Sequence, residues 1–254
     1  LPLQPYYPLV NRPLKDTYNQ IQSIRLYYDF HDVDVDRYMI NGKYQQVMLS
    51  ARELSAEKLA GEAQTWVNRQ LQFTHGYGAA LSPVNEITTE GLPVLMVKDI
   101  PPTGTPVIEQ PQIYFGEKTD NYIIVKTNTQ EFDYPMGDEN VYGYYQGKGG
   151  INIGNFVRRL VYAWQFGDFN ILISGELTPE SRILYYRNIS ERVNHIAPFL
   201  KLDSDPYLVV MDGRLFWVQD AYTVSDRYPY SEPIGGRINY IRNSVKAVID
   251  AQNG

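Results

Sequence analysis

The feature that most constrains the fold is a segment of alternating polar and apolar residues that is followed by an Asn-Gly pair. In "HDVDVDRYMINGKYQQ", which starts at His31, polar and apolar residues alternate over 32–36, and the pair Asn41-Gly42 follows shortly after. Asn-Gly favours the positive φ angles of a type I′ turn, the commonest short connection in a β-hairpin. A period of two is typical of a strand with one buried face. The stretch therefore predicts an antiparallel hairpin with strands over 27–40 and 43–51.

Three aspartates occupy alternate positions in the first of these strands: Asp32, Asp34 and Asp36. On a strand they share one face, and Val33 and Val35 share the other. We expect the valines to be buried and the aspartates to face solvent. An EF-hand calcium loop would need a curled backbone, with Gly and Glu where this sequence has Arg and Lys. We therefore predict no metal ion and no cofactor.

The rest of the chain mixes strand and helix patterns. Hairpins are predicted over 111–129 and over 206–223, the second around Asp212-Gly213, and single strands over 92–102 and 244–250. Helical spacing predicts helices over 16–25, 62–73, 155–166 and 178–197, after an extended proline-rich segment over 1–14. The terminal Asn253-Gly254 predicts that the last strand turns back onto chain beyond this sequence. We expect an α+β fold of antiparallel β-hairpins packed with several helices, with 1–254 as a fragment of one domain.

Two segments share an order of features that is compatible with an internal repeat. Both 112–160 and 206–247 run through a strand, a Thr, a Tyr-Pro pair, a Gly-Gly pair and an Ile-Asn pair. A duplicated hairpin unit and convergent turn chemistry each explain this similarity.

Charge and cysteine content exclude several classes of function. The formal net charge is −6 with dispersed Lys and Arg, so we predict no binding to nucleic acid. The chain has no cysteine, which excludes disulfides, thiolate metal sites and a cysteine nucleophile. No apolar run is long enough to span a bilayer.

Candidate catalytic residues are few, because the chain has only three histidines. His75, in "THGYG" at the end of a predicted helix, is the best candidate, although a histidine there is also an ordinary capping residue. Glu131 and Asp133 in "EFDYP" form the nearest carboxylate pair and are the candidate acids or bases. The glycine-rich loop over 147–155 fails both phosphate-loop spacings, and "GDEN" over 137–140 resembles a calcium loop only weakly.

Tyrosine is abundant, with 22 copies. Tyrosines are typical of half-buried strand positions, and they also form aromatic binding surfaces. Tyr77, Tyr134 and Tyr228 are the candidate binding residues.

Long motifs across the chain resemble the uncharacterised protein family 0182. They include "DTYNQIQSIRLYYDFHDVDVDRY", "WVNRQLQFTHGYG", "SPVNEITTEGLPVLMVKDIPP", "SRILYYRNISERV" and "APFLKLDSDPYLVVMDGRL". The resemblance implies large multi-pass membrane proteins of actinobacteria, cyanobacteria and related bacteria. It also implies transmembrane helices before this segment and further chain after Gly254. No catalytic residue is implied.

Three functions stay open at this point. The first is a domain outside the cytoplasm, attached to the bacterial cell membrane, which binds an envelope glycan or a protein partner through tyrosines. The second is a cysteine-free hydrolase of envelope polymers that uses His75 with Glu131 or Asp133. The third is a structural domain that caps the protein's own transmembrane region. The oligomeric state does not follow from the sequence.

Overall fold

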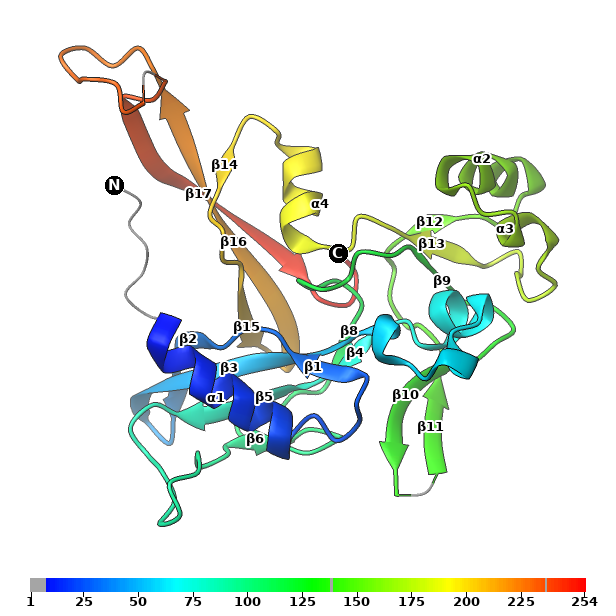
Figure 1. The fold of residues 1–254 in the computed structure, drawn as a ribbon, viewed down its shortest axis with the longest axis horizontal. Coiled ribbons are helices and arrows are strands. Elements are labelled where there is room, and N and C mark those ends of the chain that lie inside the picture. Colours follow the sequence, from blue (N-terminus) through cyan, green and yellow to red (C-terminus); the bar gives the residue numbers. More distant parts are fainter. Residues whose placement is uncertain (1–7, 138, 236) are drawn as a thin grey trace.

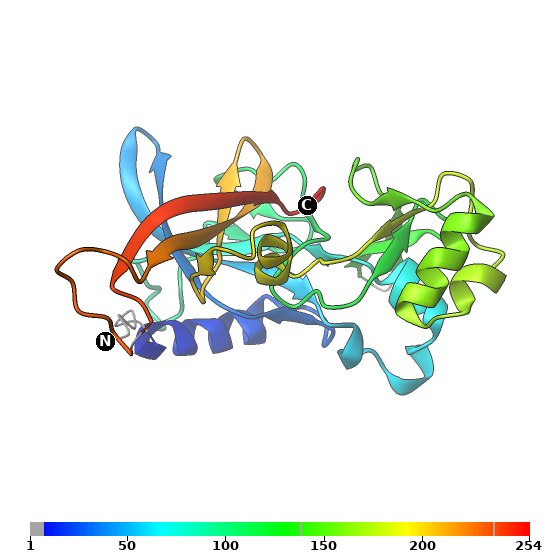
Figure 2. The same ribbon diagram turned by 90° about the horizontal axis from the view of Figure 1, so that it is seen from above.

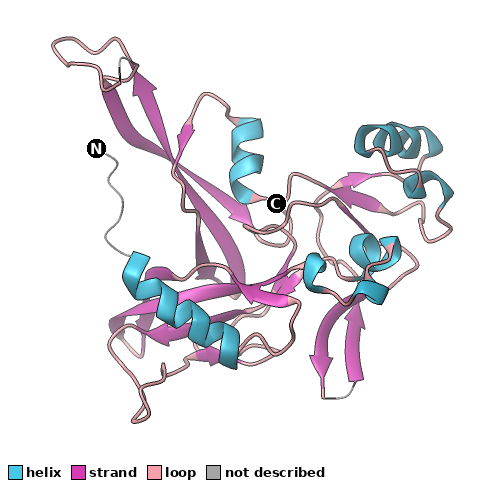
Figure 3. Ribbon diagram, in the orientation of Figure 1, coloured by secondary structure: helices cyan, strands magenta, loops and turns pink. Residues whose placement is uncertain are grey.

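A computed structural model describes residues 8–137, 139–235 and 237–254 (Figure 1). The fold is a strand-rich α+β arrangement, and all pairings between its named strands are antiparallel (Figure 3). The strands are β1 (Tyr28–Phe30), β2 (Asp34–Ile40), β3 (Lys43–Leu54), β4 (Gly76–Tyr77), β5 (Ala79–Pro83), β6 (Val97–Lys98), β7 (Thr103–Gly104), β8 (Gln112–Ile113), β9 (Ile123–Val125), β10 (Glu131–Met136), β11 (Glu139–Gly143), β12 (Ile151–Asn152), β13 (Arg182–Leu184), β14 (Lys201–Leu202), β15 (Tyr207–Met211), β16 (Arg214–Ser225) and β17 (Tyr240–Asp250). The helical elements are α1 (Pro8–Ile21), η1 (Ala56–Lys58), η2 (Gly61–Ala63), η3 (Asn68–Gln72, a π-helical turn), α2 (Phe156–Phe166), α3 (Asn170–Ile173) and α4 (Ile189–Ile196).

The first sheet is built on the predicted hairpin. Asn41 and Gly42 have φ angles of 50° and 76°, as a type I′ turn requires, and they join β2 to β3. The long strand β3 also pairs with β1 and β5, and β6 and β7 complete the sheet. Helix α1 lies along this sheet (Figures 1 and 2), where Tyr18 packs with Phe30 in a small core cluster. The hairpin prediction is confirmed.

The predicted faces of β2 are wrong. Val33, just before the strand, is buried, but Val35 is 42% exposed and Asp34 only 8% exposed. The reason is the neighbouring strand β15, whose backbone needs acceptors. The N–H of Leu208 donates to Oδ2 of Asp34 at 2.8 Å, and the N–H of Val210 donates to the Tyr38 hydroxyl at 2.8 Å. The polar face of β2 therefore points inward.

The second sheet contains the hairpin predicted around Asp212-Gly213. Asp212 and Gly213, with φ of 51° and 72°, join β15 to β16, as predicted. The strand predicted over 244–250 is confirmed within β17, but its partner is the preceding β16. The Asn253 side chain accepts the N–H of Lys148 at 2.7 Å. The pairing of this strand with chain beyond Gly254 stays a prediction.

Several other predicted elements are wrong or shorter than expected. The hairpin over 111–129 does not form, because β8 pairs with β4 and β9 pairs with β13. The helix over 178–197 is reduced to α4, because β13 joins a sheet with β9 and β12. The strand over 92–102 is reduced to β6, and the helix over 62–73 to η2, one α-turn and η3.

The first helix also differs from its prediction. It is α1, so residues 8–14 are helical rather than extended, and residues 1–7 lie outside the described part. The helix ends at Ile21, before the predicted end at residue 25, and Ile24, with a φ of 68°, is half exposed.

The main core lies between the two large sheets and includes Leu49, Phe115 and Trp217. A second core joins η3, β9, β13, α2 and α3, which form one end of the molecule (Figure 2). Of the described helices, none combines the length and apolar character needed to cross a bilayer. The repeat over 112–160 and 206–247 stays a prediction, which superposition of the two segments would test.

Candidate functional site

His75 lies in an enclosed hydrogen-bond network. Its Nε2 is 3.1 Å from Oδ1 of Asp133, and its Nδ1 is 2.9 Å from the hydroxyl of Thr74. The Thr74 hydroxyl donates to Oε2 of Glu131 at 2.6 Å. His75 directly precedes β4, whereas both carboxylates belong to β10. The structure thus brings the three candidate acid-base residues together.

The local sequence explains why His75 is held so deeply. A Cβ on Gly76 would lie 2.4 Å from the Arg52 carbonyl oxygen, so only glycine allows β4 to approach β3 this closely. Gly78 then takes a φ of 71°, a left-handed conformation that suits glycine. The two glycines of "HGYG" place His75 in the interior rather than at a helix end. The capping interpretation therefore does not describe this residue.

Two tyrosines complete the network. The Tyr114 hydroxyl donates to Oε2 of Glu131 at 2.8 Å, and the N–H of Tyr145 donates to Oε1 at 2.9 Å. The Tyr114 ring stacks on His75, with ring centroids 4.6 Å apart. Sequence reasoning missed both. The available signal was a tyrosine inside the apolar run "IYF", since a buried hydroxyl needs a partner.

The network favours a protonated His75. Burial alone would lower the pKa of His75, but its interactions with Asp133 and Glu131 outweigh burial and raise that pKa above the ordinary value. Both ring nitrogens then donate, one to Asp133 and one to Thr74. The side chain is 0% exposed. A general acid or base must come within hydrogen-bond reach of its substrate, so this geometry suits an internal ionic anchor better than a catalytic group.

The candidate binding tyrosines do not form one surface. Tyr77 is buried, and its ring centroid lies 6.5 Å from that of His75 and 5.0 Å from that of Tyr134. Tyr228 is 53% exposed and stacks on Tyr240, in the loop beyond β16. Two candidates thus belong to the His75 neighbourhood, and the third lies elsewhere.

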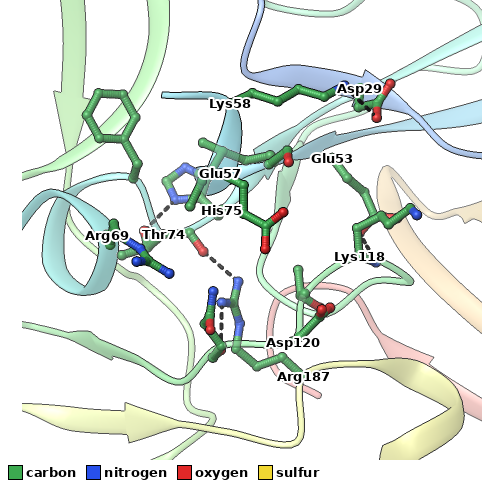
Figure 4. Close-up of a pocket in the computed structure, with 17 residues that line it drawn as sticks. Asp29, Glu53, Glu57, Lys58, Arg69, Thr74, His75, Lys118, Asp120 and Arg187 are labelled. Carbon is green, nitrogen blue, oxygen red and sulfur yellow. Dashed lines mark hydrogen bonds and ion pairs between the residues drawn. The ribbon is translucent and has the colours of Figure 1, made fainter. Parts of the chain in front are cut away.

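A charged pocket opens beside the His75 network (Figure 4). Its volume is about 320 Å³, and its walls come from β1, β3, η1, η3, β4 and the loop after β8. Lys58 forms an ion pair with Asp29 at 2.8 Å. Arg187 is buried and donates to three backbone carbonyls, those of Thr74, Tyr114 and Asn121.

Burial affects the two interior charges of this pocket. It lowers the pKa of Arg187 to about 10, and it raises the pKa of Glu53. The Glu53 carboxylate accepts the N–H groups of Glu117 and Lys118 at 3.1 and 3.0 Å. Sequence reasoning missed this pocket, because no motif spans the segments that form it.

Three carboxylates gather at the junction of the two sheets. Asp32, Asp34 and Asp205 each offer one oxygen, and these atoms lie within 4.8 Å of one another. Asp36 is not among them. Burial raises the pKa of Asp34 well above its ordinary value and that of Asp205 to about 6. An acidic cluster alone does not define a metal site. The weak calcium loop "GDEN" includes Asp138, which lies outside the described residues.

Helices α2 and α3, with the turn between them, expose several large apolar side chains, here called the α2–α3 face. Asn155 caps α2, since its side chain accepts the Val157 N–H at 2.8 Å, and Gly167 ends it with a φ of 64°. The helix is therefore where the sequence predicts it, but its apolar residues point outward. The members of the face are Phe156, Val157, Leu160, Val161, Trp164, Phe169 and Ile173, all between 49% and 86% exposed.

The fold and the site define a strand-rich α+β domain with an internal ionic network, a charged pocket and an uncovered apolar face. The sequence model of the Uncharacterised protein family (UPF0182) matches residues 9–254, and the chain belongs to this family. No solved structure shows significant similarity to the chain.

Similar proteins come from diverse organisms. A UPF0182 protein of Pelotomaculum thermopropionicum is 56% identical over 95% of this chain, which covers 27% of that protein. A UPF0182 protein of Cupriavidus necator is 58% identical over 96% of this chain and 27% of its own length. One of Trichodesmium erythraeum is 51% identical over 96% of this chain and 29% of its length. The chain thus spans less than a third of these relatives.

Proposed function

We propose that this chain is a non-catalytic interaction domain of a larger protein, and that it docks through the α2–α3 face. The observation that carries the proposal is the outward direction of the α2 stripe. A surface helix of a globular domain normally turns its apolar stripe toward the core. Here Trp164 is 86% exposed and Phe156 67% exposed, while Tyr162 and Phe166 on the opposite side pack against the second core.

The energetic argument concerns the exposed aromatic and aliphatic side chains. Burying one such side chain contributes on the order of 1.5–3 kcal/mol. Contiguous apolar patches of this kind typically mark interaction sites. Trp164, Phe169 and Ile173 are each more than three-quarters exposed. They would form the centre of an interface, where large side chains dominate binding.

We take the occupant to be another part of the full-length polypeptide, namely its expected transmembrane region. The relatives that this chain matches are more than three times as long as the matched segment. An apolar surface on a membrane-embedded partner would complement the α2–α3 face. The domain would then lie outside the cytoplasm at the bacterial cell membrane. This arrangement unites the binding function with the proposed role of capping the transmembrane region.

The hydrolase alternative has one observation in its favour, the convergence of His75, Glu131 and Asp133. Its weakness is the enclosed His75 ring, which a polymer substrate could contact only after the fold opens. We therefore rank it below docking.

Cysteine protection tests the docking proposal, since the chain contains no cysteine of its own. Trp164→Cys places one thiol on the α2–α3 face. Tyr44→Cys is the matched control, because Tyr44 is 78% exposed in the β2–β3 hairpin, away from α2. Both thiols should react rapidly with a maleimide in the isolated chain. In a full-length relative with its native cysteines replaced, the thiol at the Trp164 position should be protected and the control thiol should stay reactive.

The same experiment identifies the occupant. Protection in detergent and in bilayers indicates a protein partner, as proposed. Protection only in bilayers would assign the face to lipid instead and overturn the intramolecular docking. Equal reactivity of both thiols in the full-length protein would refute docking at this face altogether.

A further inference from the structure

The pocket in Figure 4 contains an arginine that no described side chain pairs with. Arg69 belongs to η3, and its Nε atom is buried with no hydrogen-bond partner among the described residues. No described carboxylate lies within ion-pair distance of its guanidinium. A buried donor that lacks an acceptor is unfavourable unless something else supplies one. Arg69 therefore has donors left to offer inside the pocket, as does Lys118 at its exposed rim.

The other cations of the interior are already engaged. Lys58 is paired with Asp29, and Arg187 uses its guanidinium on three backbone carbonyls. Arg187 still contributes positive potential, since its charge is buried. Lys118 lies at the exposed rim. An anionic group held inside the pocket would find free hydrogen-bond donors on Arg69.

The pocket also offers free negative charge. The carboxylates of Glu57 and Asp120 line it, both residues are exposed, and neither forms an ion pair within the described part of the chain. In Figure 4 the guanidinium groups of Arg69 and Arg187 lie on one side of the space, and these two carboxylates lie on the other. Glu53 is not free, because two backbone N–H groups hold its carboxylate.

The charge balance narrows the class of ligand. The lining holds four basic residues and four acidic residues besides His75. A polyanion such as a nucleotide would face the acids, and a simple cation would face Arg69 and Arg187. A molecule with one carboxylate and one ammonium group complements both sides at once. The volume of about 320 Å³ lies at the small end of ligand pockets, which fits an amino acid or a short peptide.

We propose that this pocket binds a small zwitterion with a free α-amino and a free α-carboxylate group. The carboxylate accepts hydrogen bonds from Arg69, and the ammonium group lies between Glu57 and Asp120. Planar guanidinium groups suit carboxylates, because two parallel N–H donors match two oxygens. The proposal is independent of docking at the α2–α3 face, which lies on other helices.

Calorimetric titration of the purified chain tests this assignment. The probes are L-alanine and L-alanyl-L-alanine, together with N-acetyl-L-alanine and L-alaninamide, which each lack one charge. At least one zwitterion should bind saturably at or below about 10 mM. Removal of either charge should weaken binding by at least about tenfold, the usual effect of losing a charged hydrogen bond. This comparison uses the unaltered protein, so it does not depend on the folding of any variant.

Variants then assign the residues. Arg69→Gln should weaken the zwitterion at least about tenfold, whereas Arg37→Gln, at an exposed arginine of β2, should not. Glu57→Gln combined with Asp120→Asn should weaken the zwitterion but leave the N-acetyl compound unchanged. The proposal is overturned if neither zwitterion binds, if the capped compounds bind equally well, or if Arg69→Gln binds like the unaltered chain.

Discussion

Replacing Glu117 by glutamine should stabilise the chain at neutral pH and leave its stability at acidic pH unchanged. Burial, together with the nearby carboxylates of Glu53 and Asp34, raises the pKa of Glu117 to about 9. The side chain of Glu117 makes no hydrogen bond to the described residues, so the isosteric glutamine removes no partner. Its backbone N–H still donates to Glu53 at 3.1 Å. The substitution therefore isolates the effect of ionisation.

The magnitude follows from linkage. Below its ordinary pKa of 4.5, a carboxyl group whose pKa is raised in the folded state is protonated in both states and costs the fold no stability. As pH rises from 4.5 toward 9, the unfolded state ionises while the folded state does not, so the fold loses stability. Between 4.5 and pH 7, each pH unit corresponds to about 1.4 kcal/mol. The glutamine variant, which does not titrate, should thus gain up to about 3 kcal/mol over the unaltered chain at pH 7. Near pH 4 the two proteins should be equally stable.

Urea unfolding at pH 4 and pH 7 measures this difference. Glu90→Gln serves as the control, because Glu90 is exposed in the loop between β5 and β6. The gain in the free energy of unfolding of Glu117→Gln over the unaltered chain should be larger at pH 7 than at pH 4. Glu90→Gln should show no such gain at either pH. An equal gain at both pH values would show that packing rather than ionisation is responsible. No gain at pH 7 would mean that Glu117 ionises without penalty, which would refute the reasoning.

Two further predictions concern His75 and the base of α2. His75→Gln should lower the free energy of unfolding by about 1–3 kcal/mol at pH 6, because Asp133 loses its charged partner. Since the pKa of His75 is raised, this loss should shrink as pH rises above 6.5, and a constant loss in urea melts at pH 6 and pH 9 would contradict it. Gly154→Ala should destabilise the chain by about 1–3 kcal/mol, because its Cβ would lie 2.0 Å from the Pro179 carbonyl oxygen. Gly61→Ala, with nothing within 4 Å of its Cβ, should be neutral or slightly stabilising in thermal melts, and equal effects of the two substitutions would refute the steric argument.

Local signals predicted the parts of this fold that depend on neighbouring residues. The Asn41-Gly42 and Asp212-Gly213 turns both adopt the positive φ angles that their sequences favour, and both join paired strands. The cap of α2 at Asn155 is equally local. In each case the determining residues lie within a few positions of one another, so the sequence contains the necessary information.

Which face of a strand or helix points to the core depends on residues far along the chain, and the sequence did not predict it. The alternation of β2 is present as expected, but Asp34 faces inward because Leu208, far along the chain, supplies a backbone N–H. The stripe of α2 has helical spacing, yet the spacing does not say whether the core or solvent covers it. His75 and Asp133 were each selected by residue type, and their contact across 58 residues follows only from the pairing of the sheets.

One short element connects the two proposed sites. The π-helical turn η3 carries Arg69 toward the pocket, and Leu71 of the same turn is buried in the core that α2 and α3 share. Just before η3, the indole of Trp66 donates to Asp168 at 2.8 Å, and Asp168 lies between α2 and α3. The α2–α3 face and the charged pocket are therefore supported by one turn from opposite sides. A segment that the sequence predicts as an ordinary amphipathic helix would thus support both proposed sites. Its Leu71 packs in the core shared with α2 and α3, and its Arg69 lines the pocket proposed to bind a zwitterion.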